Sequence, residues 1–437
     1  MAVLLRTVAI TFAIIVLALI AGAASVHFKF FPGESLSMAF VGFEALNKQY
    51  KDQKSLYNWG AVIRTNQSKR GVTRWKTDAV QEGFTLVTMG HGERIELLAL
   101  DGTPVHEWEV SYTDIWDDSG DVKELVPERF IFIRKAKMYP DGRLLVIFSA
   151  WSITPYGYGI AMLDRDSNVL WKDFRHTHHS FDQGEDGRIY TLDQQIRSYK
   201  DIGYTYLPGA FMDDGIVIYS AEGEFLSRFS LLDAFRKSPY NYVIDQLVWE
   251  NAGLGKGDLL HSNDIEVLPA NIADKFPFAS AGDLLVSFRQ IDGIVLIDQE
   301  TEAVKWFQKG YWRRQHDADF LPNGNMLIFD NHALKQSSSG KETSRVIEFD
   351  PKNMAIIWEY RPTGDEEFFS ASRGVQQRLP NGNTLITESM KGRVFEVSPS
   401  GEVVWEYYNQ TRLGQKDNLM PIIFEGERYT PEQIDFL

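Results

Sequence analysis

The chain of 437 residues contains no cysteine, which excludes a disulfide framework, a thiolate metal site and a cysteine nucleophile. It also lacks an excess of positive charge, because 45 lysines and arginines stand against 60 acidic residues, for a formal net charge of −15. Binding to nucleic-acid phosphates needs a basic surface, so we expect no nucleic-acid partner. Hydrophobic residues nevertheless make up 44% of the chain, which predicts a folded protein with a large core.

One apolar segment stands near the N-terminus. It runs from Val8 to Ala24 with a single threonine inside it, and Arg6 precedes it. With its flanks it reaches about 20 residues, the length that crosses a bilayer, and the preceding arginine favours export of the chain after this segment. Ala21-Gly-Ala23 also fits a signal-peptidase site, so a cleaved signal peptide is the alternative, and a buried core helix is a third reading. We predict a transmembrane signal-anchor over residues 1–28, single-pass in the inner (cytoplasmic) membrane, with the rest periplasmic.

A repeated unit organises most of the remaining chain. Each copy is an apolar strand, a turn rich in Asp, Ser and Gly, and a second apolar strand that ends in tryptophan or phenylalanine. Such a fixed internal repeat is the sequence signature of stacked or radial architectures. The copies end at Trp108, Trp171, Phe229, Trp306, Trp358 and Trp405.

A second kind of hairpin lies between these copies. Its turns carry Asp-Gly or Asn-Gly pairs, which tolerate the positive φ that tight hairpins need. Two hairpins per repeat give four antiparallel strands, and radial repetition of such sheets protects their edges. We therefore predict an all-β, six-bladed β-propeller over residues 79–410; a β-sandwich with fortuitous repeats is the alternative. The turns begin at Tyr139, Glu185, Leu321 and Leu379, and Leu268-Pro269 begins a copy with an insertion.

Three segments fall outside the repeats. Apolar residues at helical spacing predict a helix over 34–57, within a helical linker that we assign to residues 29–78. Residues 411–437 show no clear period and form a C-terminal tail. The apolar and aromatic segment 231–260 is an insertion, and its length suggests a lid over the channel.

Histidines gather in the segments that lead into the first hairpin of several blades. In a propeller the first strand of each blade lines the central channel, so these segments report on it. His179 and His316 lie the same number of residues before their turn glycines, and His261 falls on the same strand face. Arg289 and Asn331 are expected at the same rim, where the second strand of a blade ends. The remaining residues of these segments are His176, His178, Asn263 and Arg373.

Other readings apply to several of these positions. His178 and His179 are adjacent, so on a regular strand they point to opposite faces, and we expect His179 to face the channel. His176 and His178 have the spacing of a metal pair, but no carboxylate or thiolate stands at a fixed spacing from them, so we predict no metal. Asp264 and Asp317 are candidate orienting groups for the imidazoles, with Asp317 facing away. We interpret His27, His91, His106 and His332 as structural residues. We interpret Lys135 and Lys137 as solvated.

Three segments together resemble the bacterial arylsulfate sulfotransferases. They are His261-Ser-Asn-Asp-Ile-Glu-Val-Leu-Pro, Ser287-Phe-Arg289 and the stretch from Gln315-His-Asp-Ala to Phe329-Asp-Asn331. Members of this family are six-bladed propellers that transfer a sulfuryl group between phenols without the nucleotide donor phosphoadenosine phosphosulfate. The resemblance implies a ping-pong reaction, without a cofactor, through a transient sulfohistidine at His316.

The resemblance also implies roles for the other channel residues. His261 and Arg289 would hold the sulfuryl oxygens and assist the phenolic oxygen, with His179 as the remaining catalytic histidine. This chain lacks the N-terminal β-sandwich and the cysteine pair of better-known members, which leaves open a glycan acceptor and a homodimer. Substrate-binding roles fall to His178, Arg373, Asn263 and Asn331.

The residues themselves suit this chemistry, because a neutral imidazole is a competent nucleophile near pH 7 and arginine stabilises the charge on a sulfuryl group. Two other functions stay open. A non-catalytic, membrane-tethered propeller that binds an anionic ligand or a glycan would use the same cationic channel. A quinone-dependent dehydrogenase is less favoured, because the tryptophans here end strands and form no separate docking motif.

Overall fold

The computed structural model describes residues 2–27, 60–91, 94–116, 126–151, 155, 157–205, 207, 209–251, 257–333, 342–362 and 367–437. The chain divides into two compact units, Met1–Leu56 and Tyr57–Leu437. The first unit contains helix α1 (Ala2–His27). No helix among the described residues is long and apolar enough to cross a membrane, so the predicted transmembrane helix is not supported. The helix predicted over 34–57 lies outside the described residues.

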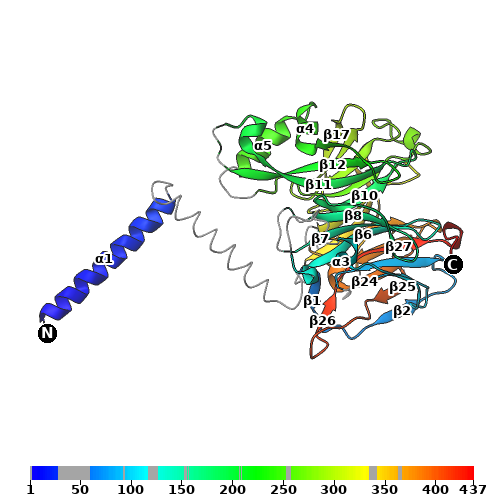
Figure 1. Cartoon of the computed structure of the whole chain (residues 1–437), viewed down its shortest axis with the longest axis horizontal. Helices are drawn as coiled ribbons and strands as arrows, with labels where there is room; N and C mark the ends of the chain where they lie inside the picture. The colour runs from blue at the N-terminus through cyan, green and yellow to red at the C-terminus, as the bar shows by residue number, and fades with distance from the viewer. Residues whose placement is uncertain are drawn as a thin grey trace. The chain divides into compact units, whose positions relative to one another are not determined.

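The second unit is built from six antiparallel sheets, which confirms the predicted six-bladed propeller of four-stranded blades (Figure 1). Their innermost strands contact one another in turn around the channel, in the order β27, β6, β10, β14, β18 and β22. Blades 1 to 3 comprise β27 (Ile423–Tyr429), β3 (Phe84–Met89), β4 (Arg94–Leu98) and β5 (Pro104–Glu109); β6 (Ile131–Met138), β7 (Leu144–Ala150), β8 (Gly157–Leu163) and β9 (Val169–Asp173); and β10 (Thr177–Gln183), β11 (Ile189–Ser198), β12 (Ala210–Tyr219) and β13 (Phe225–Ser230).

Blade 6 has a fifth strand, and a two-stranded sheet stands beside the six blades. Blades 4 to 6 comprise β14 (Ser262–Val267), β15 (Leu284–Phe288), β16 (Gly293–Asp298) and β17 (Ala303–Lys309); β18 (His316–Phe320), β19 (Met326–Ala333), β20 (Thr343–Asp350) and β21 (Ala355–Tyr360); and β22 (Val375–Arg378), β23 (Thr384–Glu388), β24 (Arg393–Val397), β25 (Val403–Tyr408) and β2 (Gly71–Trp75). The small sheet pairs β1 (Val62–Arg64) with β26 (Leu419–Pro421).

The two ends of the second unit interlock. Strand β27 comes from residues 411–437, which the sequence left unassigned, and it supplies the innermost strand of blade 1 by pairing with β3 (Figure 1). Strand β2, from the segment expected to be a helical linker, forms the outermost strand of blade 6 by pairing with β25. Strands from both ends of the unit therefore close the ring.

The recurring tryptophans join neighbouring blades. The indole N–H of Trp108 on β5 donates to the carbonyl oxygen of Gly142 in the first hairpin of blade 2, at 3.1 Å. Trp405 on β25 donates in the same way to Leu100 of blade 1, at 2.8 Å. A tryptophan at the end of a repeat is thus anchored to a turn of the next repeat, which gives the sequence pattern a physical reason.

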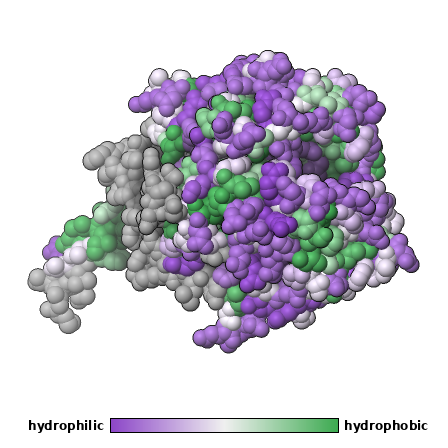
Figure 2. Space-filling view, turned by 45° about the vertical axis from the view of Figure 1, so that its right-hand side comes forward, coloured by the Kyte–Doolittle hydropathy of each residue, from purple (hydrophilic) through white to green (hydrophobic). Residues whose placement is uncertain are grey.

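Most of the apolar content lies inside and between the sheets. Strands such as β7 and β23 are buried along their whole length, whereas the face drawn in Figure 2 is mostly hydrophilic with separate hydrophobic patches. The turns that connect the two inner strands contain glycines with φ near 85°, such as Gly187 at 84° and Gly324 at 87°. Only glycine adopts this conformation without strain, which explains the recurring Asp-Gly and Asn-Gly pairs.

The insertion at 231–260 forms α4 (Leu231–Arg236) and α5 (Tyr242–Asn251). Helix α4 packs against β12 and β17, and its buried side chains Leu231 and Phe235 join the core of blades 3 and 4. The described part of the insertion therefore fills the space between two blades, which differs from the lid suggested by its length. The other short helices are α3 (Tyr112–Ile115), η1 (Glu128–Phe130), η2 (Tyr199–Ile202), η3 (Ala273–Lys275), η4 (Ser389–Lys391) and η5 (Pro431–Gln433).

Candidate active site

Bulges near the start of the innermost strands shape one end of the channel. The ladder registers shift beside Phe424 on β27, Arg134 on β6, Asn263 on β14 and Asp317 on β18. A bulge inserts an extra residue, bends the strand and re-aims the side chains around it. The structure repeats this device around the ring, so that several blades direct polar side chains to the same end of the channel.

Positive backbone φ angles occur near the starts of the inner strands as well, and at Asp317 they coincide with a bulge. His179, His261, Asp317 and Arg373 have φ between 53° and 62°, which is uncommon for residues other than glycine and recurs at functional sites. We refer to the channel end formed by these strand starts as the basic end.

His316, the first residue of β18, is held in one tautomer. Its Nδ1 lies 2.7 Å from the side-chain oxygen of Asn331 and 3.1 Å from the carbonyl oxygen of Arg314. The Asn331 amide is fixed in turn, because its NH2 group donates to the carbonyl oxygens of Ser370 and Arg373. Since both partners of Nδ1 are acceptors, Nδ1 carries the proton and Nε2 keeps its lone pair.

The charge state of His316 follows from its burial. Only 3% of the residue is exposed, and burial lowers the pKa of His316 well below its usual value, with the charges of Arg134 and Arg289 adding to the effect. The imidazole is therefore neutral at pH 7. Its Nε2 accepts a hydrogen bond from the backbone N–H of Arg373, at 3.1 Å.

His261 has a carboxylate partner that the sequence reasoning missed. Its Nδ1 is hydrogen-bonded to Oδ2 of Asp258, three residues earlier in the chain. A carboxylate on Nδ1 orients the ring and leaves Nε2 to exchange protons. Asp264 and Asp317, the expected orienting groups, are engaged elsewhere: Asp264 accepts from Ser180 and Ala318, and Asp317 accepts from the backbone of Gln376.

His178 and His179 form a pair in which one ring lies behind the other. Their Nδ1 atoms lie 2.9 Å apart, and the ring of His179 meets that of His261 at 5.2 Å between centroids. Burial lowers the pKa of both residues, to about 3 for His178. His178 is fully buried and His179 lines the channel cavity. His178 therefore supports His179 from behind, and the substrate contact predicted for it stays a prediction.

Three arginines surround the histidines. Arg289 follows β15 and Arg373 precedes β22, as predicted, whereas Arg134 on β6 was not chosen from the sequence. The guanidinium groups of Arg134 and Arg373 both lie over the ring of Phe424, at 5.3 and 5.1 Å from its centroid. Burial, together with Arg134 and Arg289, lowers the pKa of Arg373 to about 9. Such a cluster of buried cations favours an anionic ligand.

The two asparagines have different positions. Asn331 is fully buried behind His316 and is hydrogen-bonded to its Nδ1, so it orients the imidazole; its predicted substrate contact stays a prediction. Asn263 lines the channel cavity, and its NH2 group donates to the carbonyl oxygen of Gln315 at 2.7 Å. Its buried Oδ1 has no hydrogen-bond partner among the described residues. Asn263 thus offers an acceptor to a group that enters the cavity.

The opposite end of the channel, which we call the acidic end, carries carboxylates. Glu266, Asp319 and Glu427 line a cavity of about 540 Å3 there, together with Asp317 and Glu425. Several of these groups join neighbouring blades, as where Glu266 accepts from the backbone N–H of Phe320 at 2.6 Å. Burial raises the pKa of Glu266, of Asp317 and of Asp319, the last to about 7.

Two lysines neutralise part of this charge. Lys135 lies 3.7 Å from Glu425, and Lys137 lies 3.2 Å from Asp182. Although burial alone lowers the pKa of Lys135, the carboxylates of Glu425 and Asp264 raise it. The lysines are therefore charged and paired inside the channel, which corrects the interpretation that they are solvated.

His176 and His178, which have the spacing of a metal pair, do not come together in the structure. His176 turns away to the carbonyl oxygen of Gly157, at 3.0 Å, while His178 contacts His179. Within the described part of the chain, no group of three or more His, Asp or Glu side chains has the arrangement of a metal site.

The sequence and the fold were compared with those of known proteins. A family model described as arylsulfotransferase (ASST) matches residues 135–410, more than half of the chain. No curated protein matches the sequence. Solved structures that the chain matches include a protein of unknown function from Bacteroides caccae (15% identity, TM-score 0.48, covering 78% of this chain and 99% of that one) and a virginiamycin B lyase from Staphylococcus aureus (12% identity, TM-score 0.41, covering 80% of this chain and 88% of that one).

Proposed function

Because the chain belongs to the arylsulfotransferase family, we propose that it moves a sulfuryl group from an aryl sulfate to a phenolic or other hydroxyl acceptor. The reaction is ping-pong, independent of a nucleotide donor, and passes through a sulfohistidine at His316. The observation that carries this proposal is the fixed tautomer of His316, whose neutral ring keeps the Nε2 lone pair toward the basic end of the channel.

In the first half-reaction, Nε2 of His316 attacks the sulfur atom. The N–S bond forms, the bond between sulfur and the aryl oxygen breaks, and the aryl oxide leaves with the electron pair. The Nδ1 proton stays on the ring, and its hydrogen bonds to Asn331 and Arg314 stabilise the positive charge that the ring acquires.

The hydrogen bond from Arg373 to Nε2 must break as the N–S bond forms. The backbone N–H is then available to a sulfuryl oxygen, beside the cationic groups of Arg134, Arg289 and Arg373. Preorganised donors of this kind stabilise charge in the transition state, and each is worth about 3 to 4 kcal/mol.

In the second half-reaction, the acceptor oxygen attacks the sulfur atom of the sulfohistidine. The acceptor proton passes to Nε2 of His261, whose Nδ1 is held by Asp258. The new S–O bond forms, the N–S bond breaks, and His316 returns to its neutral state. His179, in ring contact with His261, completes the wall around the transferred group.

The test uses the full chain with 4-nitrophenyl sulfate as donor and phenol as acceptor. We expect release of nitrophenol by the wild type, loss of release in His316→Ala, and a mass increase of one sulfuryl group on the His316 peptide when the acceptor is omitted. His106→Ala is the matched control, because this histidine binds the carbonyl oxygen of Arg165 away from the channel. Its release rate should match that of the wild type.

A folded wild type that binds aryl sulfates without turnover would instead favour the non-catalytic propeller that binds an anionic ligand or a glycan. The membrane location, the periplasmic exposure, the glycan acceptor and the homodimer stay predictions. Each needs its own measurement, such as cell fractionation for the location and analytical ultracentrifugation for the dimer.

A further inference from the structure

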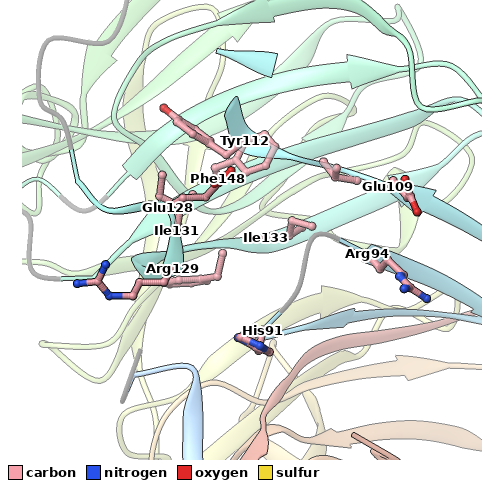
Figure 3. A pocket seen from close by; sticks show the side chains of 12 residues that line it. His91, Arg94, Glu109, Tyr112, Glu128, Arg129, Ile131, Ile133 and Phe148 are labelled. Carbon is pink, nitrogen blue, oxygen red and sulfur yellow. The ribbon is translucent and has the colours of Figure 1, made fainter. Parts of the chain in front are cut away.

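Strand β6 separates two cavities. A cleft of about 550 Å3 lies between blades 1 and 2, with Tyr112 and Phe148 above it and His91 below it in Figure 3. This cleft shares no lining residue with the cavity beside His316. The cavity beside His316 has a volume of about 10 Å3, roughly the room for one water molecule. In so small a space the histidines must be held in place, so the residues that fix them from outside the cavity matter for the reaction.

Asp214, on strand β12 of blade 3, holds the backbone next to His261. The residue is 1% exposed, and its Oδ2 accepts the backbone N–H of Ser262 at 2.7 Å. Ser262 directly follows His261, whose φ of 53° is uncommon for a residue other than glycine. The other oxygen of Asp214, Oδ1, accepts from Nε2 of Gln194 at 2.8 Å. One buried carboxyl group from blade 3 therefore fixes the chain beside the histidine at the start of blade 4.

The segment that precedes His261 is tied to the same strand. The backbone N–H of Met212 on β12 donates to the carbonyl oxygen of Gly257 at 2.6 Å. Gly257 stands next to Asp258, whose Oδ2 binds Nδ1 of His261. The second oxygen of Asp258, Oδ1, is buried and has no hydrogen-bond partner among the described residues. Strand β12 therefore supports His261 from both sides, through Gly257 before it and through Ser262 after it.

The same carboxyl group lies near the pair of adjacent histidines. Nε2 of His178 lies 3.9 Å from Oδ1 of Asp214, and Nδ1 of His178 lies 2.9 Å from Nδ1 of His179. The ring of His179 in turn contacts that of His261. Burial and the charge of Asp258 raise the pKa of Asp214 well above its usual value. The protonated form of Asp214 is therefore favoured, and it adds no second negative charge beside Asp258.

We infer that Asp214 is a positioning residue for the second half-reaction, in which His261 takes the proton of the acceptor; this inference rests on the proposed function. Asp214 does not line the cavity beside His316, so it acts by holding His261 through Ser262. In the first half-reaction no proton has to reach His261, because 4-nitrophenolate is a stable anion that leaves with the electron pair. Loss of Asp214 should therefore slow the acceptor step far more than the donor step.

The test measures the two half-reactions separately in the full chain. In Asp214→Ala, transfer from the sulfohistidine to phenol should slow about 10- to 100-fold, whereas the first release of nitrophenol should change less than about threefold. Rapid-mixing kinetics with 4-nitrophenyl sulfate, first without and then with phenol, give the two rates. Asp214→Asn keeps an oxygen that can accept the N–H of Ser262, so it should keep both rates close to those of the wild type.

The matched control is Asp213→Ala, the same truncation one residue earlier on β12. Asp213 points to the other face of the strand, where it pairs with Arg197 and Arg228. This variant should lower the free energy of unfolding and leave the ratio of the two rates unchanged. If Asp214→Ala fails to fold, Asp214→Ser serves in its place, because its hydroxyl ends one bond short of the carboxylate oxygens and keeps a polar group in the buried site.

A spectroscopic measurement keeps the inference separable from the proposed function. In NMR spectra of isotope-labelled protein, the imidazole signals of His261 should shift in Asp214→Ala, whereas those of His106, which lies away from the channel, should not. This comparison holds even if the wild type shows no turnover. Unchanged His261 signals in the folded variant, or a ratio of the two rates equal to that of the wild type, would overturn the inference.

Discussion

The two ends of the channel carry opposite charge although they are built from the same six strands. At the basic end, Arg134, Arg289 and Arg373 surround neutral histidines. At the acidic end, carboxylates such as Glu266 and Asp319 face the channel. The net charge of −15 therefore does not decide the sign of the charge on the ligand. The position of the charged residues along the inner strands decides it. An anion is attracted to one end and repelled from the other.

Lys135 lies where the two ends meet, and its replacement should have the largest effect. Lys135→Met leaves Glu425, Asp264 and Asp317 without their cation, and removal of one partner of a buried pair costs about 3 to 5 kcal/mol. We expect that loss in denaturant unfolding at pH 7.5, and a smaller loss at pH 5, where the carboxylates bind protons. The control is Lys305→Met, whose partner Asp283 lies outside the channel. Equal losses in both variants would contradict the comparison.

Arg373 tests the basic end. Arg373→Met keeps the backbone N–H that binds His316 and removes only the guanidinium, so kcat/KM should fall about 100- to 1000-fold. Steady-state kinetics with 4-nitrophenyl sulfate measure this fall, and an unchanged kcat/KM in a folded Arg373→Met protein would show that the guanidinium does not stabilise the transferred group.

Arg378→Met is the counterpart of this variant at the acidic end, on β22, the inner strand that Arg373 precedes. Arg378 pairs with Glu348 at 2.8 Å, so its loss should change the free energy of unfolding but leave KM within twofold of the wild type. A large rise in KM for Arg378→Met would show that anions also bind at the acidic end.

Asp319 should give the smallest effect. Burial and Asp264 raise its pKa from 3.8 to about 7, so the folded state keeps a proton that the unfolded state releases, and this group lowers stability as pH rises from about 4 to 7. Asp319→Asn removes that loss and can keep the hydrogen bond from Gln376. We expect a higher free energy of unfolding than that of the wild type at pH 8, no difference at pH 4, and an unchanged transfer rate, measured by thermal unfolding at the two pH values and by the nitrophenol assay.

The blades could be predicted from the sequence because each repeat contains its own reasons for folding. The Asn-Gly and Asp-Gly turns supply the required φ, and the tryptophans mark contacts such as that of Trp108 with the next blade. Counting from the turn glycines also brought His179, His261 and His316 to one end of the channel, and the structure places them there.

The features that the sequence did not reveal depend on broken periodicity. Strict alternation places His178 and His179 on opposite faces and gives Arg134 no special direction. The bulge in β10 nevertheless brings the two histidines together, and the bulge in β6 turns Arg134 toward the site. Phe424 escaped attention because its segment shows no repeat, and its place follows only from pairing of β27 with β3. Asp258 offered one usable signal, a carboxylate three residues before a channel histidine.

The closure of the ring by β27 has a consequence for the timing of activity. Residues 423–429 follow every other described strand of the blades in the chain, and they supply the wall of blade 1 with Phe424 and Glu425. Until residues 423–429 are translated and paired, the two arginines lack the Phe424 ring over which they lie. The other five blades can therefore be complete before the channel is functional, because the channel still lacks this one short strand.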